Sequence, residues 1–216
     1  MRRFAAGAAI ALLGAGCARP APRPETPLAP APTAVRVAQI VADARRAEHE
    51  VDPAARSQLA EDAGRQAEAC LAAEPQAAAC LYGHAIALGL ETRAHPVHAG
   101  ESLKRMLADL ETAETADPAY DEAGPARVRA LVLIRAPGWP LGPGDPAAGA
   151  VAARRAAELR PQYPPNLLAL AEALAKCGDA PGARAAYRQA REAAAAQPAS
   201  ADRDEWLHEA DQALQR

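Results

Sequence analysis

Prolines recur at a constant interval along this chain and divide it into units of equal length. Pro75, Pro118 and Pro161 lie 43 residues apart, and each follows a charged residue at the end of an apolar-periodic run. Proline removes a backbone donor and clashes with the preceding turn, so a helix is expected to end before each of these positions. Two helical patterns fit between successive prolines. The constant interval therefore predicts repeated units, each a pair of antiparallel helices.

The composition agrees with helices and not with sheet. Hydrophobic residues make up 50% of the chain and aromatic residues only 3%, and much of the hydrophobic share is alanine. Alanine has the highest helix propensity, whereas strands favour the β-branched and aromatic residues that are scarce here. We therefore predict an all-α fold with enough apolar surface for a real core.

The repeat unit is clearest at residues 164–197. Its first helix has leucines at helical spacing on one face, a Gly-Asp pair makes the turn, and the second helix has small and aromatic residues at intervals of three and four. The matching positions are Ala171, Gly178, Asp179, Ala183, Tyr187 and Ala190. This pattern resembles the tetratricopeptide (TPR) repeat, in which short side chains let neighbouring helices approach closely.

The TPR resemblance implies a right-handed superhelix of about four antiparallel helical hairpins over residues 36–216, with a C-terminal capping helix at 201–214. The units exceed the family's usual length of about 34 residues, and we place the additional residues in two enlarged loops, 92–100 and 136–146. First helices of TPR-like units line a concave groove that binds a partner or ligand. The residues expected there are Tyr82, Ile86, Arg129, Val132, Leu168 and Glu172, with Trp139 from the second loop. The alternative for Trp139 is a hydrophobic plug that holds its loop to the stack.

The first 17 residues have the pattern of an export signal. Two arginines precede an apolar run at residues 4–16, which is too short to span a bilayer, and Cys17 follows it. The ending LLGAGC resembles a bacterial lipobox, with Gly14 where that motif prefers an aliphatic residue. The resemblance implies that Cys17 is lipidated. The alternative is an ordinary cleaved signal peptide with a soluble secreted product.

Residues 18–35 are expected to be a tether. The segment contains six prolines, the last at position 32, and such a sequence favours an extended chain over a helix. Ala18, and not an aspartate, follows the cysteine. By resemblance to lipoprotein sorting, this favours the periplasmic side of the outer membrane.

A second family resemblance concerns the loop at 136–146. The loop reads APGWPLGPGDP, and the following helix ends in LRPQYPPN at residues 159–166. This looks like a segment of the T-component lipoproteins associated with TRAP-type transporters, although the present chain is shorter. Those proteins are TPR-like, partner a periplasmic solute-binding protein and are thought to handle an apolar ligand. The resemblance implies the same kind of partner and ligand here.

Three further cysteines are present. Cys70 and Cys80 lie on either side of the Pro75 turn, where their Cα atoms could come within disulfide distance. The two alternatives are a disulfide and a pair of small buried residues at close helix contacts. Cys177 is expected to be a small buried hydrophobe.

Signals for catalysis or a cofactor are weak. His84, His95 and His98 could approach one another, but no cysteine or carboxylate completes a recognised zinc spacing, so we predict a solvated loop and no metal. No catalytic triad, phosphate loop or Cys-x-x-Cys motif is present in the sequence. The formal net charge is −3 and becomes more negative without residues 1–17, which argues against nucleic acid binding. We therefore expect neither an enzyme nor a cofactor.

Three hypotheses of function follow. The first is a membrane-anchored periplasmic scaffold or adaptor that binds protein partners in the cell envelope. The second is a T-component-like accessory protein that binds a small apolar solute and a solute-binding protein, and it predicts an enclosed, mostly apolar cavity. The third, a hydrolase or metalloenzyme, requires His84, His95 and His98 to converge on a metal.

Overall fold

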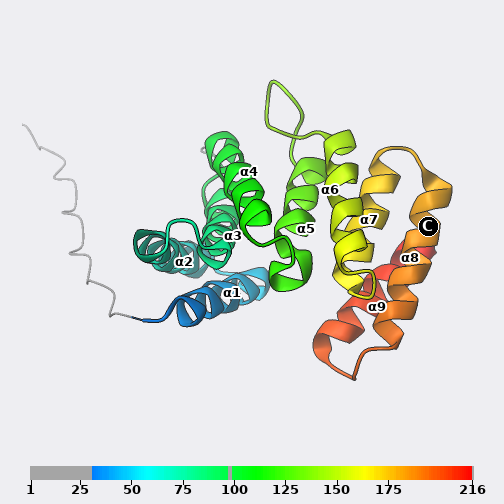
Figure 1. The fold of residues 1–216 in the computed structure, drawn as a ribbon, viewed down its shortest axis with the longest axis horizontal. Helices are drawn as coiled ribbons and strands as arrows, with labels where there is room; N and C mark the ends of the chain where they lie inside the picture. The colour runs from blue at the N-terminus through cyan, green and yellow to red at the C-terminus, as the bar shows by residue number, and fades with distance from the viewer. Residues whose placement is uncertain (1–30, 97–98, 216) are drawn as a thin grey trace, which may run out of the picture.

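The chain folds into helices connected by short turns (Figure 1). The computed structural model describes residues 31–96 and 99–215. The predicted signal segment, Cys17 and most of the predicted tether lie outside the described residues. The helices are α1 (Thr33–His49), α2 (Pro53–Ala73), α3 (Ala78–Ala94), α4 (Ala99–Ala116), α5 (Tyr120–Arg135), α6 (Pro146–Leu159), α7 (Pro164–Lys176), α8 (Ala180–Ala195) and α9 (Ala201–Leu214). The predicted all-α class is confirmed for this part of the chain.

Successive helices pair and the pairs follow one another in chain order. Within each pair, α1 packs on α2, α3 on α4, α5 on α6, and α7 on α8. Each second helix also packs against the first helix of the next pair, and α8 packs against α9. The first helices and α9 contact one another in sequence order and form one layer, with the second helices on its other side. The repeat proline follows the second helix of each of the first three pairs.

Local sequence sets many of these boundaries. The side chains of Asp52, Asp145, Asp179 and Ser200 accept hydrogen bonds from backbone N–H groups in the first turns of α2, α6, α8 and α9. Prolines also occupy the first helical turns of α2, α6, α7 and α8, where no backbone donor is needed. Gly178, after α7, has a φ of +82°, which is the left-handed conformation predicted for this turn.

The two loops predicted to be enlarged differ in the structure. Helices extend into the segment 92–100 from both sides, because α3 continues to Ala94 and α4 begins at Ala99. Longer helices therefore take up the additional residues of this repeat, and the prediction of a large loop was wrong there. The segment between Arg135 and Pro146 is a true loop that leaves the helical body at the junction of α5 and α6 (Figure 1). The helical domain also begins at Thr33 and not at residue 36.

Short side chains allow the close packing of the pairs. Alanines dominate the buried face of α6, and Gly149 on the same helix lies against α5. A Cβ atom at Gly149 would come within 2.5 Å of Ile134 Cγ2, so a larger residue fits only if Ile134 or the helix shifts. Within the part that the structure describes, none of the helices is both long and apolar enough to cross a membrane.

Candidate binding groove

An apolar pocket of about 600 Å³ opens on the layer of first helices. Its walls come from α1, α3 and α5, and residues of α4 line it as well. The lining residues are Ala44, Glu48, Ile86, Gly89, Leu90, Thr92, Arg93, Pro96, Ala99, Leu103, Met106, Val128, Leu131, Val132, Arg135, Ala136 and Pro137. Two of the residues expected in the groove, Ile86 and Val132, therefore line this pocket.

Two further pockets adjoin it, one smaller and one more polar. One of about 170 Å³, between α5, α7 and α9, includes Leu168 and Glu172 and shares Leu131 and Arg135 with the apolar pocket. The other, of about 620 Å³, lies at the ends of α1 and α3 and shares Glu48, Leu90 and Arg93 with the apolar pocket. Glu205 of α9 lines both of these neighbours. The three pockets therefore form one continuous groove, and we use "the groove" for this set.

The groove contains charges that are already paired. Arg135 donates from Nε and Nη2 to the carboxylate of Glu172 at 2.6–3.2 Å, which joins α5 to α7. The hydrogen bonds to Glu172 raise the pKa of the Arg135 guanidinium. Burial raises the pKa of the nearby Glu209 carboxyl, and Arg135 opposes this change. Across the groove, Arg45 of α1 pairs with Asp202 of α9 at 3.4 Å, so the two ends of the helix layer approach each other.

Tyr82 and Arg129 do not lie where the TPR resemblance placed them. Tyr82 is only 5% exposed, and its hydroxyl donates to Asp121 Oδ2 at 2.7 Å. Its ring meets that of Tyr120 edge-on, so Tyr82 belongs to the core. Arg129 donates from Nη2 to Glu114 Oε2 at 2.8 Å and links α5 to α4. Both side chains therefore contact neighbouring helices.

The irregular start of α5 is a left-handed turn. Asp121, Glu122 and Ala123 have φ values of 46°, 55° and 63°, a region that residues other than glycine seldom adopt. The buried guanidinium of Arg127 donates to the carbonyl oxygens of Asp121 and Glu122 at 3.3 and 3.2 Å, and to Asp121 Oδ2 at 3.0 Å. These bonds satisfy carbonyls that a regular helix would have paired and hold the turn in place.

Asn166 completes this polar network from α7. It is fully buried, with an exposed fraction of 0%, and its Oδ1 accepts from Arg127 Nη1 at 3.0 Å. Its Nδ2 donates to Glu122 O at 2.9 Å and to Ala156 O at 3.1 Å. The network was not predicted from the sequence. The only signal was an asparagine near the start of a helix, five residues after the repeat proline, and nothing in the sequence pointed to Arg127 as its partner.

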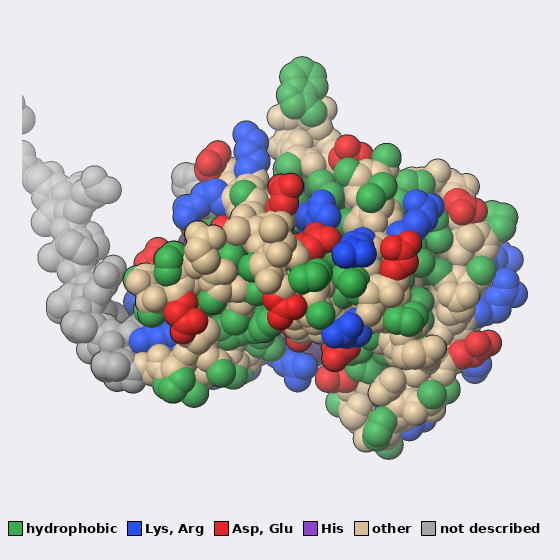
Figure 2. Space-filling model, in the orientation of Figure 1, with side chains coloured by type: hydrophobic (Ala, Val, Ile, Leu, Met, Phe, Trp, Pro, Cys, Tyr) green, Lys and Arg blue, Asp and Glu red, His purple; other side chains and the backbone are tan. Residues whose placement is uncertain are grey.

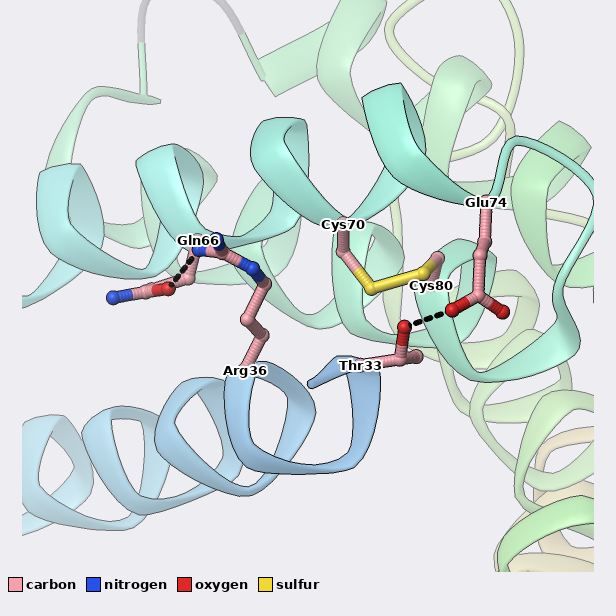
Figure 3. Close-up of a disulfide and its surroundings, with 6 residues drawn as sticks. All are labelled: Thr33, Arg36, Gln66, Cys70, Glu74 and Cys80. Atoms are coloured by element: carbon pink, nitrogen blue, oxygen red, sulfur yellow. Dashed lines mark hydrogen bonds between the residues drawn. A yellow bond between two sulfur atoms is a disulfide. The ribbon is translucent and has the colours of Figure 1, made fainter. Parts of the chain in front are cut away.

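The alternatives left open for the cysteines are separated by the structure. Cys70 and Cys80 form a disulfide between α2 and α3, with Cα atoms 5.3 Å apart. Figure 3 shows the first turn of α1 beside it, where Thr33 donates to Glu74 and Arg36 Nη1 donates to Gln66 Oε1 at 2.9 Å. Cys177 is exposed at the end of α7, so the expectation that it is buried was wrong.

Trp139 lies outside the groove. Its side chain is 90% exposed on the 136–145 loop, although the base of that loop, at Ala136 and Pro137, lines the apolar pocket. The alternative that Trp139 is a plug packed on the stack was therefore wrong.

A polar pocket of about 440 Å³ lies between α2, α3 and α4. His84 and His95 line it, and His84 Nδ1 lies 2.7 Å from Asp109 Oδ2. Among the described residues, no three His, Cys, Asp or Glu side chains are placed to hold a metal ion. His98 lies outside the described residues. The structure therefore adds no support to a metalloenzyme.

Comparison with models of protein families gives no match for this chain, and comparison with curated proteins gives none either. What the fold and the groove define is an all-helical protein with an open, largely apolar pocket on its layer of first helices.

Proposed function

We propose that this chain is a TPR-like binding protein that holds a small, mostly apolar ligand in the groove. The single observation that carries the proposal is the 600 Å³ apolar pocket between α3 and α5. Pockets of 300–1,000 Å³ lined by aliphatic side chains with a few polar groups are the usual sites for small organic ligands. The proposal includes a TPR-like superhelical stack, because first helices line the groove as they do in that family.

The chemistry of the lining indicates what the ligand would be. Ile86, Leu103, Met106 and Leu131 offer aliphatic contact, so the body of the ligand is expected to be hydrocarbon-like. Arg93 lines both the apolar pocket and the pocket at the ends of α1 and α3, and it offers a guanidinium to a polar group of the ligand. An apolar ligand would suit the second hypothesis, an accessory protein of a TRAP-type system that works beside a solute-binding protein on the periplasmic side of a membrane. The pocket is open, however, and not the enclosed cavity that this hypothesis predicted.

A glycine in the pocket provides the test. Gly89 lines the apolar pocket, and a Cβ atom there would make only ordinary contact, 3.6 Å from Met106 Cε. Gly89→Leu should fill the pocket without breaking α3, since leucine is also a better helix former than glycine. We expect N-phenyl-1-naphthylamine, a neutral apolar fluorescent probe, to bind the wild-type chain. Its affinity for Gly89→Leu should be lower by about tenfold or more.

Gly64→Leu is the matched control. Gly64 is also a mid-helix glycine, it lines the polar pocket between α2 and α3, and a Cβ atom there meets nothing within 4 Å. It should leave probe binding unchanged. Equal binding by wild type and Gly89→Leu would show that the probe does not bind in the apolar pocket.

Native mass spectrometry of the purified chain gives a second measurement, in which a co-purified small molecule should be lost from Gly89→Leu alone.

The second candidate is the scaffold or adaptor that binds a protein segment. The observation that favours it is the continuity of the groove, which runs from the apolar pocket to charged residues of α7 and α9. An extended peptide with apolar residues followed by charged ones would suit this arrangement. Glu209→Ala should weaken a peptide partner that spans both ends, whereas it should not affect a ligand held only between α3 and α5.

A further inference from the structure

The loop at 136–145 presents large apolar side chains to solvent. Trp139 is 90% exposed and Leu141 is 81% exposed, which places both among the most exposed large hydrophobic residues of the described chain. The loop projects beyond the helices between α5 and α6 (Figure 1), and Figure 2 shows a hydrophobic group at its tip. Exposed apolar groups of this size are uncommon without an interaction that covers them.

Backbone hydrogen bonds define the shape of the loop. Leu141 N donates to Gly138 O at 3.0 Å, Gly144 N to Pro137 O at 2.8 Å, and Asp145 N to Leu133 O at 2.9 Å. At Gly144, a Cβ atom would come within 2.1 Å of Ala136 O. A glycine is therefore required where the two ends of the loop approach each other. The tip is therefore held away from the body by its own backbone, and its apolar side chains do not contribute to the helical core.

The chemistry of the tip fits a lipid surface better than a protein. Residues 136–144 include no ionisable side chain. A stable protein interface buries about 800 Å² on each partner and usually has a polar rim, whereas this tip is convex and has two large apolar side chains. A bilayer surface accepts a small convex apolar tip of any shape, and tryptophan favours the interface between headgroups and acyl chains.

We propose that Trp139 and Leu141 insert into the interfacial region of a lipid bilayer. The anchor predicted at Cys17 would bring the domain to a membrane, but it lies 16 residues before Thr33 and does not fix which face turns toward the lipid. Insertion of the tip supplies that orientation. Because Ala136 and Pro137 at the base of the loop also line the apolar pocket, insertion brings that side of the groove toward the bilayer. The insertion does not depend on what the groove binds.

The test uses tryptophan fluorescence in the full chain. The sequence has two tryptophans, so Trp206→Phe leaves Trp139 as the only indole, and phenylalanine keeps a ring against Tyr163. The protein is mixed with phosphatidylcholine vesicles whose acyl chains are brominated, since bromine quenches only indoles close to it. We expect strong quenching of Trp139 that persists at high salt, because no charge takes part. Adding Leu141→Asp should abolish the quenching.

The matched control moves the reporter to another exposed site. Val51 is 88% exposed between α1 and α2, and a chain with Val51→Trp, Trp139→Phe and Trp206→Phe should show no quenching by the same vesicles. A chain that floats with the vesicles while Trp139 stays unquenched would overturn the proposal. Emission from Trp139 that shifts with protein concentration in the absence of lipid would assign the tip to contact between copies and would also overturn it. Probe binding by Gly89→Leu remains a separate measurement of the groove.

Discussion

Two joints between successive helix pairs occupy the same place in the repeat and are built with different chemistry. In the first joint, Cys70 of α2 and Cys80 of α3 form a disulfide. In the third joint, Asn166 of α7 donates from Nδ2 to the carbonyl oxygen of Ala156 of α6 at 3.1 Å. In both joints the two residues lie five positions before and five positions after the repeat proline.

The second joint shows what the other two have in common. Its residues at the same positions are Ala113 and Ala123, and like those of the other joints they are fully buried. The place is therefore buried in all three joints, and it holds two cysteines in the first, two alanines in the second, and an alanine and an asparagine in the third. The covalent joint needs no further residues. The polar joint depends on Arg127 and on the left-handed turn at Asp121–Ala123, so damage to it should spread to α5.

The polar joint should be the more sensitive of the two. Asn166→Leu removes the acceptor for Arg127 Nη1 and the donor to the carbonyl oxygens of Glu122 and Ala156, all in the interior. We expect it to lower the free energy of unfolding by about 3–4 kcal/mol, because buried polar groups would lose their partners. Urea denaturation measures this. Gln162→Leu, on the exposed turn before α7, should change it by no more than about 0.5 kcal/mol. A loss below about 1 kcal/mol for Asn166→Leu would mean that packing alone holds this joint.

The covalent joint should cost somewhat less to break. Cys70→Ala with Cys80→Ala opens a short loop across the Pro75 turn, and we expect the free energy of unfolding to fall by about 3 kcal/mol. A reducing agent should lower the stability of the wild-type chain by a similar amount. Cys177→Ser serves as the control, since that thiol is exposed and should leave the denaturation midpoint unchanged. If reduction leaves the wild-type denaturation midpoint unchanged, the disulfide does not stabilise the first joint.

The sequence offered the first joint as one of two alternatives and gave no sign of the third, and the reason is physical. Cysteines on either side of a proline turn have one chemistry available for pairing, so Cys70 and Cys80 could be proposed as partners from their spacing alone. Asn166 accepts and donates with many possible groups, and its partner Arg127 is 39 residues away. Only the left-handed turn at Asp121–Ala123 brings the two together. No glycine occupies these three positions, so the sequence gives no sign of their positive φ values.

The same limit explains which groove residues could be predicted from the sequence. The TPR resemblance predicted that Ile86 and Val132 line it, and the first helices follow the repeat there. Tyr82 was expected beside them but lies in the core, where its hydroxyl donates to Asp121 of the irregular turn. Regular positions could thus be transferred from the clearest repeat to earlier ones, whereas positions near the turn could not. Of the two segments predicted to be enlarged loops, the proline- and glycine-rich segment 136–146 is a loop, whereas in 92–100 α3 continues to Ala94 and α4 begins at Ala99.

The smallest expected difference between the joints is their response to alkali. Burial raises the pKa of the Tyr82 hydroxyl, which donates to Asp121 beside Arg127, above its ordinary value of 10.0. Below pH 10 the hydroxyl is protonated in both the folded and the unfolded chain, and its contribution to stability is complete. Above pH 10 only the unfolded chain releases the proton, so the free energy of unfolding should fall by up to about 1.4 kcal/mol per pH unit from this group.

Urea denaturation between pH 9 and 11 should show a shallower decline of the free energy of unfolding for Tyr82→Phe than for wild type. The variant without the Cys70–Cys80 disulfide should keep the wild-type slope, because it leaves the bond from the Tyr82 hydroxyl to Asp121 in place. Identical slopes for wild type and Tyr82→Phe would place the alkali-sensitive group elsewhere in the chain.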